Sequence, residues 1–220
     1  MEFTSLRDRS NDIVSGLLHL TGTAGAITVL VLLLIQSSSL DGWHITGYTL
    51  FGSGMILLYL GSTSYHLLSP RWPRTKAWAQ RLDHALISIL IAGTYTPVLF
   101  IGLDGGWRWS LFGVIWGLAL VSFGIKLFDL RLPSFLSVTL YLAMGWLILI
   151  AFQPLRENLT SLMLILLASG GIAYTLGVLF FVLEDHFPPK RYFWMHEIFH
   201  VFVLLGSTLH SIVMFLLLTV

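Results

Sequence analysis

The chain contains no cysteine and few charged residues, and both shortages restrict what kind of protein it can be. Without cysteine it has no disulfide, no thiolate nucleophile and no metal site with sulfur ligands. Charged residues make up only 10% of its 220 residues, whereas apolar residues reach 56%. An ordinary globular protein is roughly 25% charged and places most of those residues on a wetted surface. The composition therefore indicates an integral membrane protein.

The charge balance also argues against a nucleic-acid partner. The formal net charge is only +1, and the twelve basic residues are spread along the chain in small groups. Proteins that bind nucleic acid usually carry a basic patch or stripe that follows the phosphate backbone. No such stripe exists here, so we expect no nucleic acid to bind.

Seven mostly apolar runs are long enough to cross a membrane as helices, since a bilayer core needs roughly 20 residues. Turn-forming residues separate the runs, and the loops are too short to hold a further domain. We find no internal repeat. The predicted fold class is all-α, a single seven-helix transmembrane domain over residues 1–220, in the plasma or inner cell membrane. The predicted spans are residues 15–36, 45–68, 82–102, 107–127, 134–153, 159–183 and 193–219.

Lysine and arginine fall almost entirely on one side of this topology, and that asymmetry sets its orientation. With the N-terminus in the cytoplasm, only Arg108 and Arg156 lie in outer segments. The prediction is a cytoplasmic N-terminus and an external C-terminus. The first span has no clear positive leader and is longer than a signal peptide's apolar region, so we expect it to be retained. The basic residues on the inner side are Arg7, Arg9, Arg71, Arg74, Lys76, Arg81, Lys126, Arg131, Lys190 and Arg191.

Ionisable residues are costly inside a bilayer, so those within the spans are candidates for function. His196 and His200 open the last span at a spacing of four, which places both imidazoles on one helical face. His66 ends the second span and Asp83 opens the third. The predicted orientation brings all four residues into the cytoplasmic half of the membrane, although they are far apart in the sequence.

Three histidines with an open fourth position form a zinc arrangement of the catalytic type, so we predict a Zn²⁺ site with His66, His196 and His200 as ligands. Such an ion activates its bound water and polarises a carbonyl. We expect Asp83 to orient that water or accept its proton. Ser62 lies one turn before His66 on the same face, and we expect it to hydrogen-bond within the site or stabilise a developing oxyanion. The other histidines and the Glu184-Asp185-His186 segment are interpreted as structural, interfacial or solvated.

These motifs resemble those of the hemolysin III branch of the progestin and adipoQ receptor family, which includes the adiponectin receptors. The similar segments are Ser62-x3-His66, Asp83 within RLDHALISILIAGTYTP, and His196-x3-His200 within HEIFHVFVLLGSTLH. The resemblance implies a zinc ion near the cytoplasmic face, bound by the three histidines, with Asp83 contacting it through water. The wider superfamily contains alkaline ceramidases, which implies hydrolysis of lipid amide bonds, and bacterial members are linked to membrane homeostasis.

The expected function is therefore zinc-dependent hydrolysis of a lipid amide or ester, in membrane lipid homeostasis. The partner would be a membrane lipid, fatty acyl or ceramide-like, with an acyl chain between the helices, where apolar cavities suit it. A non-enzymatic receptor, sensor or cytolytic pore with structural zinc stays open as an alternative. The sequence lacks the charged, water-lining faces of a wide pore, which weakens the cytolytic reading for a single chain.

Three other readings fit less well. The sequence HEIFH also matches the H-E-x-x-H motif of zinc proteases, in which Glu197 would be the general base. That reading gives Asp83 no role. A serine-hydrolase triad of Ser62, His66 and Asp83 lacks the exposed nucleophile turn and leaves the pair in the last span unexplained. A retinal-binding pump needs a lysine in the last span, where this chain has none.

Overall fold

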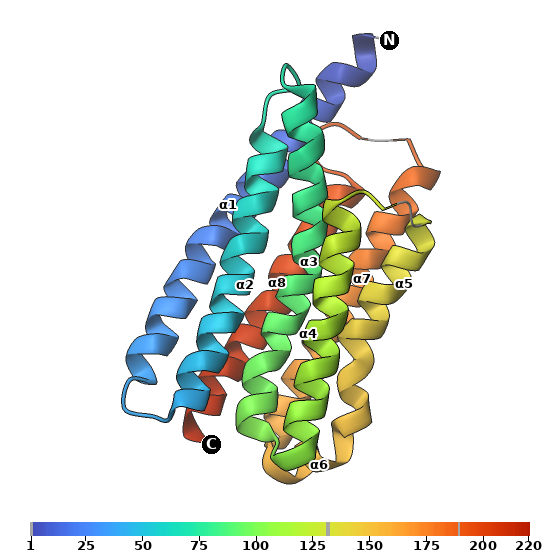
Figure 1. Cartoon of the computed structure of the whole chain (residues 1–220). Helices are drawn as coiled ribbons and strands as arrows, with labels where there is room; N and C mark the ends of the chain where they lie inside the picture. The colour runs from blue at the N-terminus through green and yellow to red at the C-terminus, as the bar shows by residue number, and fades with distance from the viewer. Residues whose placement is uncertain (1, 131–132, 189) are drawn as a thin grey trace.

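The computed structural model describes residues 2–130, 133–188 and 190–220, with the backbone alone for residues 2–9, 134 and 185. Within these ranges the chain is helical between short connections, and no strand forms. Arg131, which the orientation prediction counts, lies outside the described residues, as do the side chains of Arg7 and Arg9. The α-helices are α1 (Glu2–Gln36), α2 (Gly42–Leu67), α3 (Pro73–Gly102), α4 (Gly105–Leu127), α5 (Ser134–Trp146), α6 (Phe152–Asn158), α7 (Ser161–Leu183) and α8 (Met195–Leu216) (Figure 1).

Seven helical segments are long and apolar enough to cross a membrane, as the sequence predicts. The fifth is composite, because α5 continues through the 3-10 segment η1 (Leu147–Ala151) into the short helix α6. Two further 3-10 turns, η2 (Glu184–His186) and η3 (Leu217–Thr219), follow α7 and α8. The chain is therefore an all-helical, multi-pass membrane protein.

Several helices extend beyond the apolar runs that predict them. α3 begins at Pro73, well before the predicted span at residue 82, and α1 continues back through the charged leader. Proline is favourable in the first turn of a helix, where its missing N–H has no intrahelical partner in any case. An apolar run marks only the part of a helix that contacts hydrocarbon. A helix that continues into the headgroup layer is therefore longer than its run.

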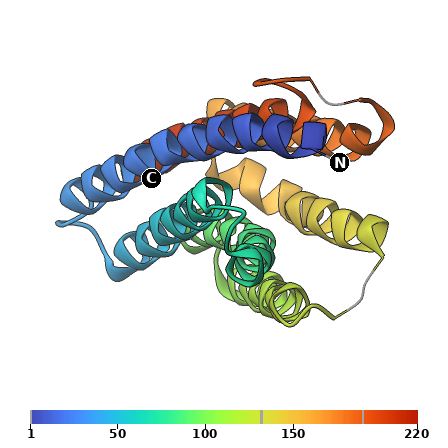
Figure 2. The same ribbon diagram turned by 90° about the horizontal axis from the view of Figure 1, so that it is seen from above.

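The packing of the helices brings the end of α2 beside the start of α8. α2 packs against α1 and α3, α3 against α4, and α7 against α8, while α8 also returns to α1. Seen from above, α1 and α8 lie along one side of the bundle and α3 and α4 lie on the opposite side (Figure 2). The N-terminus lies at the top of Figure 1, the end that the charge pattern predicts to be cytoplasmic. Helices that are first, second and last in the chain thus meet at that end.

Two glycines allow α2 and α3 to approach closely. A Cβ on Gly93 would lie 2.8 Å from the carbonyl oxygen of Leu50, and a Cβ on Gly47 would lie 2.9 Å from the Cα of Pro97. Both neighbours are backbone atoms, which cannot move aside without separating the helices. Small residues commonly serve this purpose in membrane bundles. The contact fixes α2 against α3, and these helices carry three of the predicted site residues.

The irregular fifth span is stabilised by a tyrosine from α3. The Tyr95 hydroxyl donates to the carbonyl oxygens of Met144 and Gly145, at 2.6 Å and 2.9 Å, and accepts the N–H of Ile148 at 2.9 Å. A 3-10 turn interrupts the regular i to i+4 bonding of a helix, so some backbone groups lose their usual partner. The hydrocarbon core offers no water to replace it. Tyr95 supplies the missing partner from inside the bundle.

Candidate metal centre

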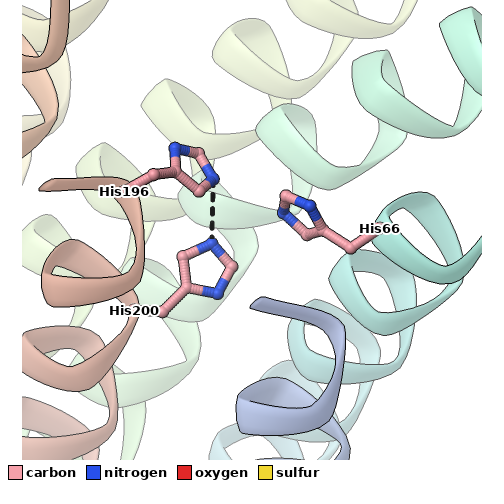
Figure 3. Close-up of side chains that lie close together, drawn as sticks. All are labelled: His66, His196 and His200. Carbon is pink, nitrogen blue, oxygen red and sulfur yellow. Dashed lines mark hydrogen bonds between the residues drawn. The ribbon is translucent and has the colours of Figure 1, made fainter. Parts of the chain in front are cut away.

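Three histidines from two helices converge at the predicted cytoplasmic end of the bundle. His66 lies in the last turn of α2, and His196 and His200 lie in the first turns of α8. One ring nitrogen from each lies within 4.8 Å of the other two, and the Nε2 atoms of His196 and His200 are 3.1 Å apart. The three rings surround a common point (Figure 3). We call these residues the histidine cluster.

The donor spacing of the histidine cluster fits a single cation. Tetrahedral zinc with Zn–N bonds of 2.0–2.1 Å places its nitrogen ligands about 3.3 Å apart. The 3.1 Å separation between His196 and His200 is close to that value. The Nε2 atom of His66 is buried and no described residue hydrogen-bonds to it. A buried nitrogen without a partner is costly, and a cation at the centre of the cluster would satisfy it.

Two carboxylates accept hydrogen bonds from the Nδ1 atoms of two cluster histidines, on the side of each ring away from the centre of the cluster. Asp12 of α1 accepts a hydrogen bond from Nδ1 of His66 at 3.0 Å, and Glu184 of η2 accepts one from Nδ1 of His196 at 3.0 Å. A carboxylate at Nδ1 keeps the proton on that nitrogen and leaves the Nε2 lone pair for a metal. Asp12 also pairs with Lys76 of α3. The two rings are therefore oriented as metal ligands usually are.

The third histidine is held by packing. The His200 ring stacks on His19 of α1 with ring centroids 3.9 Å apart, and it meets the His66 ring edge-on at 5.0 Å. His19 is buried, and neither of its ring nitrogens has a partner among the described residues. The sequence interpretation treats His19 as structural or interfacial. The structure places it against the histidine cluster, inside the bundle.

Ser62 and Asp83 face the same interior space as the last-span histidines. Both residues are buried, and both line a cavity of about 290 Å³ together with His196 and His200. The Ser62 hydroxyl lies near the Asp83 carboxyl, and it forms no hydrogen bond of 3.5 Å or less with any described residue. His66 is not among the residues that line the cavity, and it meets the cluster from the α1 side. The structure thus brings all five predicted site residues to one end of the bundle.

The cavity continues from the histidine cluster toward the middle of the bundle. Its walls come mainly from α3, α5, α7 and α8, and most of its lining side chains are apolar. His200 lies beside the cluster and His210 lines the far end. Ten residues of helix correspond to about 15 Å along the axis. The cavity is therefore elongated, and the charged side chains in its wall, Asp83 and Lys126, lie toward the predicted cytoplasmic end.

Glu197 faces α1 rather than the interior of the cluster. Its carboxylate accepts hydrogen bonds from the Asn11 side chain at 3.0 Å, the Ser15 hydroxyl at 3.0 Å and the N–H of Trp194 at 2.6 Å. The residue is 1% exposed. A carboxylate with three donors already bound has little capacity left to act as a general base. This arrangement argues against the H-E-x-x-H protease reading and gives Glu197 a structural role, joining α8 to α1.

The sequence interpretation missed the two supporting carboxylates. It assigned Glu184 to a solvated helix end, and the side chain is indeed 36% exposed there, but it also hydrogen-bonds to His196. Asp12 belongs to a charged leader that carries no recognisable spacing relative to His66. The one available signal is topological, because both acidic residues fall on the side of the membrane where the histidines converge. That signal does not distinguish them from other acidic residues on the same side.

The fold and the histidine cluster together define a class, that of seven-helix membrane proteins with a histidine site at one end of the bundle. Within that class the chain belongs to the haemolysin-III-related family, whose sequence profile matches residues 7–211. The family that the motifs resemble is thereby confirmed. Membership also agrees with a multi-pass protein of the cell membrane.

Individual relatives support this assignment. The chain is 39% identical to Hemolysin-3 of Bacillus cereus over 199 residues, which cover 90% of this chain and 87% of the relative. It is 38% identical to the Hemolysin-3 homolog of Bacillus subtilis (strain 168) over 197 residues, 89% of each chain. The ADIPOR-like receptor IZH2 of Saccharomyces cerevisiae is more distant, at 26% identity over an alignment of 236 positions, gaps included, that covers 94% of this chain and 72% of the relative.

Proposed function

We propose that this protein is a zinc-dependent hydrolase that cleaves an amide or ester bond of a membrane lipid. Its cellular role would be membrane lipid homeostasis. The observation that carries the proposal is the histidine cluster at the end of an elongated apolar cavity that Asp83 and Ser62 also line. A ligand triad alone is compatible with a structural metal. A ligand triad beside an elongated apolar cavity, which suits an acyl chain, favours chemistry on a lipid.

His66, His196 and His200 would hold the zinc. Three imidazoles are a common donor set for zinc, and three protein ligands leave a fourth position open for water or substrate. When bound, the zinc supplies Lewis-acid polarisation of a carbonyl and lowers the pKa of a coordinated water toward neutrality. The carboxylates of Asp12 and Glu184 keep two of the three imidazoles in the tautomer that this requires.

Asp83 and Ser62 have separate roles in this proposal. The buried Asp83 carboxylate would accept a proton from the attacking water as that water adds to the lipid carbonyl. It would then return this proton to the amine or alcohol that leaves when the acyl C–N or C–O bond breaks, which releases the fatty acid. The unpartnered Ser62 hydroxyl donates to the carbonyl oxygen as negative charge develops there. Both side chains lie on the wall nearest the histidine cluster, where the reacting carbonyl would be held.

The apolar part of the cavity would hold the acyl chain of the lipid. Burial of methylene groups against apolar side chains contributes roughly 0.8 kcal/mol for each CH₂ removed from water. The cavity begins at the predicted headgroup depth and runs toward the bilayer centre, which matches the orientation of a membrane lipid. A fatty acyl or ceramide-like lipid can therefore place its amide or ester near the cluster while its chain occupies the interior.

The test compares metal content and lipid turnover in purified protein and in an Asp83→Ala variant. We expect about one zinc per chain in both, because Asp83 is not among the three ligands. Hydrolysis of ceramide or phospholipid should fall by about 100-fold or more in the variant, the usual range for loss of a general base. An Asp129→Asn variant, with its change at the same end but outside the cavity, serves as the matched control.

Two results would contradict the proposal. Zinc bound at full stoichiometry with no turnover of any lipid would favour a structural metal in a receptor or sensor. Full zinc stoichiometry after alanine replacement of all three histidines would remove the metal centre itself.

A further inference from the structure

A second group of polar side chains lines the cavity at the same end as the histidine cluster. Lys126 lies in the last turn of α4, His84 lies on α3, and Ser137 lies on α5. Ser137 is buried, and its hydroxyl has no hydrogen-bond partner among the described residues. The side chains of Lys126 and His84 form no hydrogen bond or ion pair within the described part of the chain. Three helices thus present three free polar groups to one cavity.

The position of Lys126 differs from that of an ordinary interfacial lysine. Lysines at helix ends usually extend along the lipid-facing surface so that the ammonium reaches water. Lys126 is instead half-buried and lines an interior cavity. The carboxylate of Asp129 is near enough to act on the charge of Lys126, but it is exposed and forms its ion pair with Arg81 at 2.7 Å. The Lys126 side chain therefore contributes to the wall of a cavity in which Asp83 is the one acidic side chain among the described lining residues.

The surrounding contacts hold this group in place. Tyr141, one turn after Ser137 on α5, donates a hydrogen bond to the carbonyl oxygen of His84 at 2.8 Å, which joins α5 to α3 beside the cavity. Asp83 is the only acidic residue among the described residues that line the cavity, and it lies next to the histidine cluster. The hydrogen-bond donors Lys126, His84 and Ser137 thus line the same cavity as Asp83 and the last-span histidines.

We propose that Lys126, His84 and Ser137 form a subsite for the phosphate of an anionic lipid whose acyl chain occupies the cavity. An ammonium, an imidazole and a hydroxyl all donate hydrogen bonds to phosphate oxygens, and the charged donor forms the strongest of these bonds. A neutral lipid such as ceramide brings no negative charge to interact with the ammonium. A phosphate-bearing glycerolipid places its phosphate in the headgroup layer and its ester one glycerol unit deeper. The favoured substrate is therefore an acidic phospholipid, cleaved at an ester.

The position of the cleaved bond rests on the proposed hydrolase, but the binding preference does not, so the two are tested separately. The binding experiment uses purified protein in neutral detergent with fluorescent phosphatidic acid and with diacylglycerol of the same acyl chains. These probes differ only in the phosphate. We expect the wild-type protein to bind phosphatidic acid about tenfold or more tightly, in the range of a hydrogen-bonded charge pair.

The variants separate this subsite from general attraction between positive charge and acidic lipid. Lys126→Gln should remove most of the preference, and Lys126→Arg should retain it. Ser137→Ala should reduce it by a smaller factor. Arg74→Gln is the matched control, because Arg74 is exposed at the same end of the bundle and does not line the cavity. It should leave the preference unchanged. Each variant is first checked for native helix content and monodispersity.

Several outcomes overturn the inference. Equal affinity of the wild-type protein for both probes would do so, as would an equal loss of preference in Lys126→Gln and Arg74→Gln. Displacement of the lipid by millimolar inorganic phosphate would indicate a site for free phosphate instead. Selective binding without hydrolysis would support the subsite and contradict the hydrolase. Hydrolysis of ceramide without any preference for acidic lipid would support the hydrolase and contradict the subsite.

Discussion

The carboxylate of Asp12 offers the sharpest test of how the histidine cluster is organised. It accepts the Nδ1–H of His66 at 3.0 Å and also pairs with Lys76. Replacing Asp12 with alanine removes the group that keeps the proton on Nδ1 and the Nε2 lone pair directed at the cluster. The ligand itself stays in the protein. The prediction is a weaker affinity for zinc without a loss of the fold.

The structure sets the size of the effect. Loss of a hydrogen-bond partner behind a metal-bound histidine typically lowers metal affinity by about 10- to 100-fold, or about 1.4–2.7 kcal/mol. The side chain of His66 is only 3% exposed, so packing limits how far the ring can turn. Contact with the rings of His196 and His200, at centroid distances of 5.2 Å and 5.0 Å, limits it further. We therefore expect a loss in the lower half of that range.

Competition with a chromophoric chelator at fixed pH measures zinc affinity for the wild-type protein and each variant. Asp12→Asn keeps an acceptor oxygen and should lose less affinity than Asp12→Ala. Asp129→Asn, which breaks an ion pair at the same end of the bundle without touching a histidine, should bind zinc like the wild type. Native affinity in a folded Asp12→Ala variant would refute the reasoning. An equal loss in the asparagine and alanine variants would show that charge, not hydrogen bonding, is responsible.

Three further predictions concern the bundle. Tyr95→Phe leaves the backbone groups of the fifth span without their partner and should destabilise the protein by about 1–3 kcal/mol, measured by unfolding in detergent against Tyr192→Phe. Gly93→Ala places a Cβ 2.8 Å from a backbone oxygen and should cost about 1–3 kcal/mol, whereas Gly113→Ala, with nothing within 4 Å, should not destabilise. Glu197→Gln should lower the melting temperature but retain lipid turnover. A larger loss of turnover than in Asp83→Ala would restore the protease reading.

The fold was predictable from the sequence because the bilayer restricts the possible structures so strongly. A chain that must satisfy its backbone inside hydrocarbon forms helices of nearly fixed length, so seven apolar runs indicate seven spans. The convergence of His66 with His196 and His200 was also predictable, since the direction of each span sets the depth of its ends. No side-chain geometry was needed for either conclusion.

The supporting contacts of the cluster were not predictable in this way. The hydrogen bonds that His66 donates to Asp12 and His196 donates to Glu184 depend on side-chain rotamers and on how the helix ends pack together. Spacing along one helix carries no information about such contacts between helices. The stacking of His19 on His200 has the same origin, because it depends on how α1 packs against α8. The depth of a residue in the membrane can be predicted from the topology, but its contacts with other helices depend on how the helices pack.

The distribution of the three histidines over α2 and α8 has a consequence for biogenesis. Chains are made from the N-terminus, so the first two spans enter the bilayer well before the last one emerges. Until α8 arrives, a nascent chain holds only His66 of the three histidines of the cluster. If the histidine cluster holds zinc as proposed, the site is complete only after the last span is in place, and a truncated chain that lacks this span should bind no zinc there.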